Sequence, residues 1–198
     1  PHAGGNKGQY QLLKRSLCEI FDPEILELPY RQFDRIDEEL PSWKKWIELA
    51  HESFLERIDG PFILMGHSLG ALIAYELLKK AQNSVSLPEY CLVCSSFIAP
   101  TAAHIQKIEP ISHLNDSEFI KKLELYFPIP EALKQHKQFY EYFIKQTRRD
   151  FLLLESYKDE PYLKEKITGK IKAFAASSDK LHSFTSMSSW SEFTESDF

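Results

Sequence analysis

A short glycine-framed segment, Gly66-His67-Ser68-Leu69-Gly70, has the residue types and spacing of a nucleophilic serine site. The apolar run Phe62–Met65 precedes it and predicts a buried strand, and the periodic segment Leu69–Lys80 follows it and predicts a helix. A G-x-S-x-G between a strand and a helix forms a sharp turn that holds the serine hydroxyl out at the end of the strand. The glycines let the strand and the helix pass closely, and the free N–H groups of the helix favour a developing oxyanion. We therefore predict that Ser68 is a catalytic nucleophile and not a helix-capping serine.

A serine hydroxyl needs a base to activate it and an acid to orient that base. In folds built on this turn, the chain order is serine, then aspartate or glutamate, then histidine. Asp179 follows an apolar run at 171–176 that predicts a strand, so we expect Asp179 to be the acid. His182 is the only histidine after Asp179, and we expect it to be a surface loop residue, because a partner three residues away rarely reaches both acid and serine. His104 and His113 precede the acid and His67 points away from the hydroxyl, so the sequence predicts a base outside these 198 residues.

The order of elements along the chain predicts the fold class. Short apolar strands alternate with amphipathic helices, which is typical of a mostly parallel sheet with helices on both faces. The expected strands cover 23–29, 62–65, 90–97 and 171–176, and the expected helices cover 9–20, 41–58, 69–80 and 188–194. A helical block rich in charge interrupts this alternation at about 114–160. We therefore predict a single domain over 1–198 with an α/β-hydrolase fold and a helical lid at about 114–160.

Composition and charge exclude some classes of partner. The chain has 198 residues, 43% hydrophobic and 27% charged, which suits a soluble domain with one sizeable core. The formal net charge of −5 argues against nucleic acid as the main partner. No apolar run approaches the roughly 20 residues that span a bilayer, and we expect no membrane association.

Three cysteines, an odd number in a chain this long, are not typical of a disulfide framework, which favours a reducing cytoplasm. Cys91 and Cys94 form a CxxC inside the apolar run 90–96. A redox or metal site is one interpretation of this pair, and small buried core residues are the favoured one.

Together these segments resemble the type II thioesterases of nonribosomal peptide and polyketide synthesis, along nearly the whole chain. The opening Pro1-His2-Ala3-Gly4-Gly5 resembles the loop that follows the first inner strand of that family. The segment 66–75 resembles its nucleophile turn, and Ser177-Ser178-Asp179 resembles the loop that carries its acid. Weaker similarity covers 98–100 with His104, Arg149-Asp150 and 155–157, and Trp190 and Thr194.

The chain departs from the family pattern in three places. Leu28-Pro29-Tyr30-Arg31 stands where the family has Pro-Gly-Arg or Pro-Gly-His, and Ser177 replaces a glycine. The family places Gly-Gly-His a few residues beyond the position of Phe198, so we expect the chain to be truncated at both ends. For the same reason we expect the isolated 198 residues to fold weakly and to hydrolyse little.

The resemblance implies a serine thioesterase that hydrolyses acyl or peptidyl thioesters on the phosphopantetheine arms of carrier proteins. It implies oxyanion donors at the N–H groups of Ala3 and Leu69, no metal or organic cofactor, and a monomer. The lid carries large apolar residues that either line an acyl pocket or pack between helices. It also carries cations that either dock an acidic carrier protein or form a solvated face. The apolar set is Phe139, Tyr140, Tyr142, Phe143, Phe151 and Leu152, and the lid cations are Lys134, Lys137, Lys145, Arg148 and Arg149.

Three alternatives stay open at this point. A carboxylesterase or lipase acting on small esters would share every argument about the serine, the acid and the base. A non-catalytic hydrolase fold that binds acyl groups or carrier proteins would account for the absent base. A redox protein would use Cys91 and Cys94.

Overall fold

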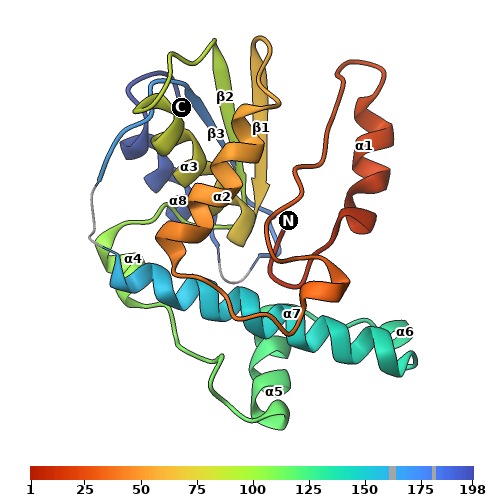
Figure 1. Cartoon of the computed structure of the whole chain (residues 1–198). Coiled ribbons are helices and arrows are strands. Elements are labelled where there is room, and N and C mark those ends of the chain that lie inside the picture. Colours follow the sequence, from red (N-terminus) through yellow and green to blue (C-terminus); the bar gives the residue numbers. More distant parts are fainter. Residues whose placement is uncertain (161–163, 180–181) are drawn as a thin grey trace.

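A parallel three-stranded sheet forms the centre of the described chain. The computed structural model describes residues 1–160, 164–179 and 182–198. The strands are β1 (Phe62–His67), β2 (Tyr90–Ser95) and β3 (Lys170–Phe174), side by side in that order (Figure 1). All of them are parallel, with Phe62 opposite Tyr90 and Cys91 opposite Lys170. Their carboxyl ends therefore meet at one edge, where ligands of open α/β sheets bind.

Helices separate the strands of this sheet along the chain. The block between β2 and β3 is helical, in the region where the sequence predicts a lid (Figure 1). The α-helices are α1 (Gln11–Leu17), α2 (Trp43–Leu55), α3 (Leu69–Gln82), α4 (Ala102–Gln106), α5 (Asp116–Tyr126), α6 (Glu131–Lys134), α7 (Lys137–Ser156) and α8 (Phe184–Met187). The 3-10 helices are η1 (Lys7–Tyr10), η2 (Phe33–Arg35), η3 (Tyr157–Asp159) and η4 (Ser188–Phe193).

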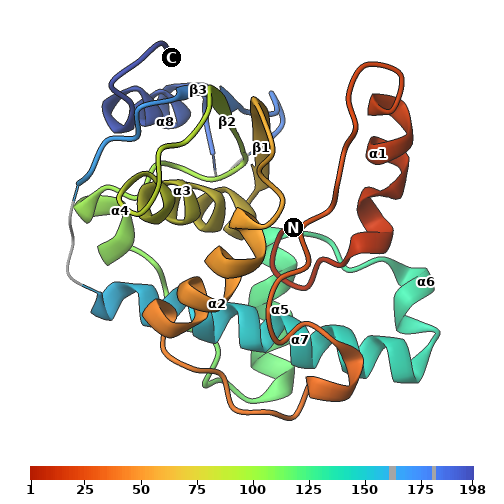
Figure 2. The ribbon, with the colours of Figure 1, turned by 45° about the horizontal axis from the view of Figure 1, so that its top comes forward.

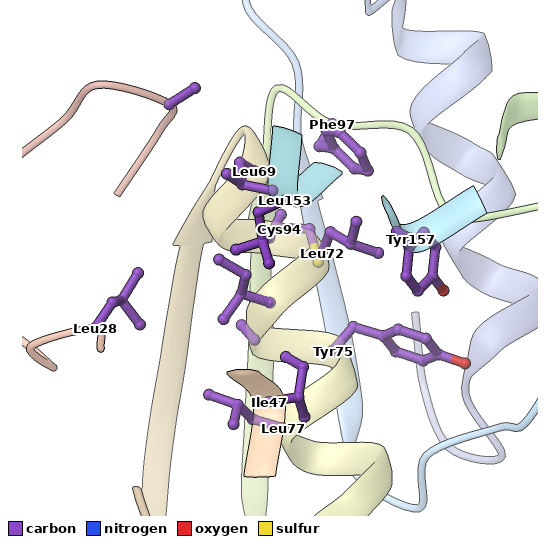
Figure 3. Close-up of a cluster of buried hydrophobic side chains, with 14 of the residues drawn as sticks. Leu28, Ile47, Leu69, Leu72, Tyr75, Leu77, Cys94, Phe97, Leu153 and Tyr157 are labelled. Carbon is purple, nitrogen blue, oxygen red and sulfur yellow. The ribbon is translucent and has the colours of Figure 1, made fainter. Parts of the chain in front are cut away.

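The core lies between one face of the sheet and the helices α2, α3 and α7. Helix α3 is apolar around most of its circumference and is buried from Leu69 to Leu78. Figure 3 shows Leu72 of α3, Ile47 of α2 and Leu153 of α7 in one buried cluster. Burying a large aliphatic side chain contributes roughly 1.5–3 kcal/mol, so this cluster fixes the start of α3 firmly against the sheet.

The second face of the sheet differs from the prediction. Ile63 and Met65 of β1 are 52% and 47% exposed, and Phe174 of β3 is 59% exposed. Their neighbours Leu64 and Ile171 point to the other face and pack in the core. The expectation of a strand buried on both faces is therefore wrong for β1, because no described element covers its second face.

Two elements expected in the first thirty residues also differ. The segment 23–29 forms no strand, because within the described residues no strand lies beside it to complete a hydrogen-bonded ladder. Helix α1 is shorter than the expected helix at 9–20, and none of its residues is buried. Leu12 and Ile20 are 75% and 76% exposed, so the apolar side of this segment faces outward.

Candidate active site

Ser68 stands at a strained turn between β1 and α3. Strand β1 ends at His67 and α3 begins at Leu69, which confirms the predicted strand–turn–helix. The backbone angles of Ser68 are φ 54° and ψ −126°, a conformation that costs a non-glycine residue about 1–3 kcal/mol. The Ser68 N–H donates to the Ser95 carbonyl at 2.7 Å, and Ser68 O accepts from Ala71 N–H at 2.8 Å. The neighbouring strand and the helix therefore hold the serine in this strained geometry.

The two glycines of the turn serve different contacts. A Cβ at Gly66 would stand 2.2 Å from the Gly70 carbonyl oxygen, so strand and helix meet backbone to backbone there. A Cβ at Gly70 would instead stand 2.7 Å from the Pro1 carbonyl oxygen. The opening loop is thus pressed onto the first turn of α3. Ala3 follows in the same loop and is buried, so the loop of one expected oxyanion donor adjoins the helix of the other.

Asp179 and His182 are joined, contrary to the expectation for His182. The Asp179 carboxylate accepts the His182 backbone N–H at 3.0 Å and lies 3.3 Å from His182 Nδ1. The side chains are only 15% and 18% exposed, so His182 is not a free surface residue. No hydrogen bond joins His182 to Ser68 among the residues that the structure describes. The expected acid therefore has an imidazole partner, which is three residues away in the same loop.

Other histidines gather around the turn without contacting the Asp179 carboxylate through a hydrogen bond in the described chain. His67 Nδ1 lies 3.1 Å from Ser95 Oγ, and His104 Nδ1 donates to the Ala99 carbonyl at 3.2 Å. Burial is the largest cause that lowers the pKa of both imidazoles, and the charge of Asp179 opposes it at His67. These rings are therefore neutral near pH 7 and are committed to structural partners.

A buried ion pair, absent from the sequence-based site, adjoins the opening loop. Asp150 Oδ2 accepts from Arg31 Nη2 at 2.6 Å and from the Gly4 backbone N–H at 2.7 Å. Arg31 Nη1 also donates to the Gly5 carbonyl. Both residues lie in segments that the sequence comparison singled out, but their separation of 119 positions conceals the contact. One feature of the sequence could have revealed the pair. Asp150 is a charged residue on the face of α7 that otherwise carries Phe143, Thr147 and Phe151, all of which are buried.

Some of the large apolar lid residues are buried and others are exposed, so neither a pocket lining nor packing between helices describes the whole set. Phe143 and Phe151 are buried, whereas Phe139 and Leu152 are 66% and 51% exposed. Each lid cation has an acceptor within 4 Å, which argues against a surplus of positive charge for docking. The pairs are Lys134–Glu124, Lys137–Glu141, Lys145–Asp37 and Arg148–Asp116, and Arg149 donates to the Ile36 carbonyl.

The cysteine pair does not form a site. Cys91 and Cys94 are free thiols three residues apart on β2, so their side chains leave opposite faces of the sheet. Cys94 is fully buried, and burial raises its pKa well above the usual value. Across the described ranges, no cluster of three or more His, Cys, Asp or Glu side chains is arranged to hold a metal ion. None of the described helices is long and apolar enough to cross a membrane.

Comparison with known proteins identifies relatives along the whole chain. The model of the thioesterase domain family matches residues 1–198. The gramicidin S biosynthesis protein GrsT of Aneurinibacillus migulanus is 25% identical over 201 residues, covering 100% of this chain and 76% of GrsT. The probable anguibactin biosynthesis thioesterase AngT of Vibrio anguillarum is 29% identical over 163 residues, covering 79% of this chain and 62% of AngT.

Solved structures with the same fold include two thioesterases. The type II thioesterase BorB from the borrelidin biosynthetic cluster superposes with a TM-score of 0.79 at 22% identity, covering 100% of this chain and 81% of BorB. The RedJ thioesterase from the prodiginine pathway of Streptomyces coelicolor superposes with a TM-score of 0.82 at 20% identity, covering 100% of this chain and 76% of RedJ. These likenesses establish the α/β-hydrolase fold, and the family match confirms the resemblance to thioesterases. The chain therefore belongs to the thioesterase domain family.

Proposed function

We propose that this chain is the catalytic domain of a serine thioesterase that hydrolyses acyl or peptidyl thioesters on the phosphopantetheine arms of carrier proteins. The strained turn at Ser68, with the opening loop pressed onto the helix that follows it, carries this proposal. Relatives named for gramicidin S and anguibactin biosynthesis support the substrate class that the family resemblance implies.

In the proposed reaction, Ser68 Oγ attacks the thioester carbonyl carbon and a tetrahedral oxyanion forms. The N–H groups of Ala3 and Leu69 stabilise that oxyanion, and each such donor contributes about 3 kcal/mol. Collapse breaks the C–S bond, and the thiol of the arm leaves with the proton taken from Ser68. Water then attacks the acyl-serine through a second oxyanion, gives one of its protons to Ser68 Oγ and releases the carboxylic acid.

We propose Asp179 as the acid that orients the catalytic imidazole. The resemblance to type II thioesterases implies that this imidazole belongs to a Gly-Gly-His segment. His182 is then a partner that holds the Asp179 loop, which suits its backbone N–H donation to the carboxylate. The helical block at about 114–160 acts as the lid over the arm, and the protein acts as a monomer without metal or organic cofactor.

The substrate class is tested by comparing two substrates with the full-length protein. We expect kcat/KM for an acyl-carrier protein to exceed that for a p-nitrophenyl ester of the same acyl group by at least a hundredfold. Equal values would favour a carboxylesterase. Stoichiometric binding of the acyl-carrier protein with no turnover of either substrate would favour the non-catalytic alternative.

A further inference from the structure

The opening loop is attached to the lid helix α7 through an unusual set of buried contacts. We propose that Arg31 and Asp150 are a positioning pair that fixes the 3–5 segment on α7 and so holds the Ala3 N–H toward the reacting oxygen. The inference rests on the function proposed above and adds residues that do not touch the substrate. Its consequence is that α7 is a fixed support for the oxyanion loop and not a freely moving part of the lid.

The backbone of Gly4 lies directly against α7. Gly4 has φ 73°, a left-handed conformation that favours glycine, and a Cβ there would stand 2.2 Å from Thr147 Oγ1 and 2.8 Å from Phe143 Cε2. Thr147 Oγ1 donates to the Phe143 carbonyl at 2.6 Å, so this contact surface is itself held in place. Both Figure 1 and Figure 2 show the N-terminal loop between the end of β1 and α7. The loop thus connects the nucleophile turn to the lid helix.

The Arg31–Asp150 ion pair binds this loop at two backbone groups, the Gly4 N–H and the Gly5 carbonyl. Asp150 accepts the Gly4 N–H, and Arg31 donates to the Gly5 carbonyl while it pairs with the same carboxylate. The second oxygen of Asp150 accepts from Gln146 Nε2 at 3.0 Å, on the preceding turn of α7. The side chains of Arg31 and Asp150 are 12% and 5% exposed. Buried charges are costly, and a hydrophobic pair of similar volume often serves stability as well, so stability alone is a weak reason for this pair.

The backbone at Tyr30 and Arg31 is also strained, and α7 holds it in place. Tyr30, immediately before Arg31, has φ 61°, the left-handed region that a tyrosine rarely adopts. Tyr142 of α7 donates its hydroxyl to the Arg31 carbonyl at 3.0 Å. A strained residue persists where its surroundings dictate its conformation. Here the surroundings direct the Arg31 side chain toward Asp150 and Gly5.

This arrangement places the Ala3 N–H one residue before an amide whose direction is fixed by a buried carboxylate. Oxyanion stabilisation depends on donors that are oriented before the reaction, because a donor that must reorganise loses most of its advantage. Loosening the Gly4 amide would therefore reduce the stabilisation of the transition state more than it reduces substrate binding. The expected signature is a fall in kcat with little change in KM.

The test uses the full-length protein and an acyl-carrier protein substrate. In Asp150→Asn, the volume is kept and the charge is lost, and we expect kcat to fall by roughly ten- to a hundredfold while KM stays within threefold. In Arg31→Lys, which keeps the charge but not the two-pronged donation, we expect a smaller fall in kcat. In the double variant Arg31→Met with Asp150→Leu, we expect urea unfolding close to that of the wild type but a kcat as low as in Asp150→Asn.

Glu155→Gln is the matched control on the same helix. Glu155 also holds a loop, because its carboxylate accepts the Ile111 and Ser112 backbone N–H groups at 2.8 Å. We expect this variant to lose stability and to keep its kcat within twofold.

Recovery of the wild-type kcat in the stable double variant would overturn the positioning role while leaving the proposed function intact. A wild-type protein that turns over no thioester would overturn the proposed function and this inference with it. If Asp150→Asn fails to fold, the double variant and Arg31→Lys still decide between the two roles.

Discussion

Gly66 lies against Gly70 so closely that a Cβ on Gly66 would stand 2.2 Å from the Gly70 carbonyl oxygen and 2.5 Å from Ala71 Cα. The contact is backbone to backbone, so no side-chain rotation relieves it. It joins the end of β1 to the first turn of α3, the two elements whose meeting sets the conformation of Ser68. The geometry of the candidate nucleophile therefore depends on a glycine two residues before it.

Gly66→Ala tests this dependence. The added methyl must displace the α3 backbone, and we expect a loss of about 3 kcal/mol in the free energy of unfolding, measured with urea. Gly60→Ala is the matched control, because a Cβ at Gly60 meets no atom within 4 Å. We expect Gly60→Ala to leave the unfolding midpoint unchanged or slightly raised. Equal effects in the two variants would refute the proposed close contact.

Substitutions of Asp179 and His182 are expected to affect turnover to different extents. Asp179→Asn removes the acceptor that orients the catalytic imidazole, and we expect kcat for an acyl-carrier protein to fall about 10⁴-fold. His182→Gln keeps a polar side chain of similar reach beside the carboxylate, and we expect a loss of less than tenfold. A loss above a thousandfold in His182→Gln would instead make His182 the general base.

The buried imidazole of His2 predicts a loss of stability in mild acid. Burial is the largest cause that lowers the pKa of His2, to about 4, below the unfolded value of roughly 6.5. The unfolded chain therefore binds the proton more tightly, so the folded protein loses stability as the pH falls from about 6.5 toward 4. In His2→Phe, we expect the drop in unfolding free energy between pH 7 and pH 4.5 to be smaller by roughly 2 kcal/mol.

Urea unfolding at the two pH values measures this difference, and only the change with pH is compared, since His2→Phe also removes the contact with Tyr10. His113→Phe, at an exposed position, serves as the control. An acid-induced loss in His2→Phe as large as in the wild type would contradict the assignment.

The lid cations are not expected to select the carrier protein. Lys145 lies 2.8 Å from Asp37 and Lys137 lies 3.9 Å from Glu141, so neither presents an uncompensated charge. We expect Lys137→Ala and Lys145→Ala each to change KM for the acyl-carrier protein by less than twofold, because exposed pairs contribute little. A fivefold rise in KM that 0.5 M salt abolishes would restore the docking interpretation.

Much of the fold could be predicted because its signals are local. The glycine spacing around Ser68, the apolar run of β2 and the periodicity of α2 and α3 each act within a few residues. The second face of β1 could not be predicted, because the composition of Ile63 and Met65 indicates burial whether or not an element covers them. The segment 23–29 fails for a related reason, since alternation predicts a strand but only a neighbouring strand completes it.

In the candidate site too, residues marked by a local pattern could be predicted and contacts made by tertiary packing could not. Ser68 and Asp179 follow from motif and chain order, and their roles stay predictions that the experiments above test. The contact between Asp179 and His182 was missed because the sequence gives a spacing but not the conformation of a three-residue loop. The Arg31–Asp150 pair was missed because tertiary packing brings together segments that carry no shared local pattern.

The most direct test of the nucleophilic role of Ser68 is the rate at which the full-length protein and its Ser68→Ala variant release free acid from an acyl-carrier protein. We expect turnover by the wild type and a loss of at least a thousandfold in the variant, because the acyl group must pass through Ser68 Oγ. A Ser68→Ala protein that is folded and releases acid at the wild-type rate would contradict it.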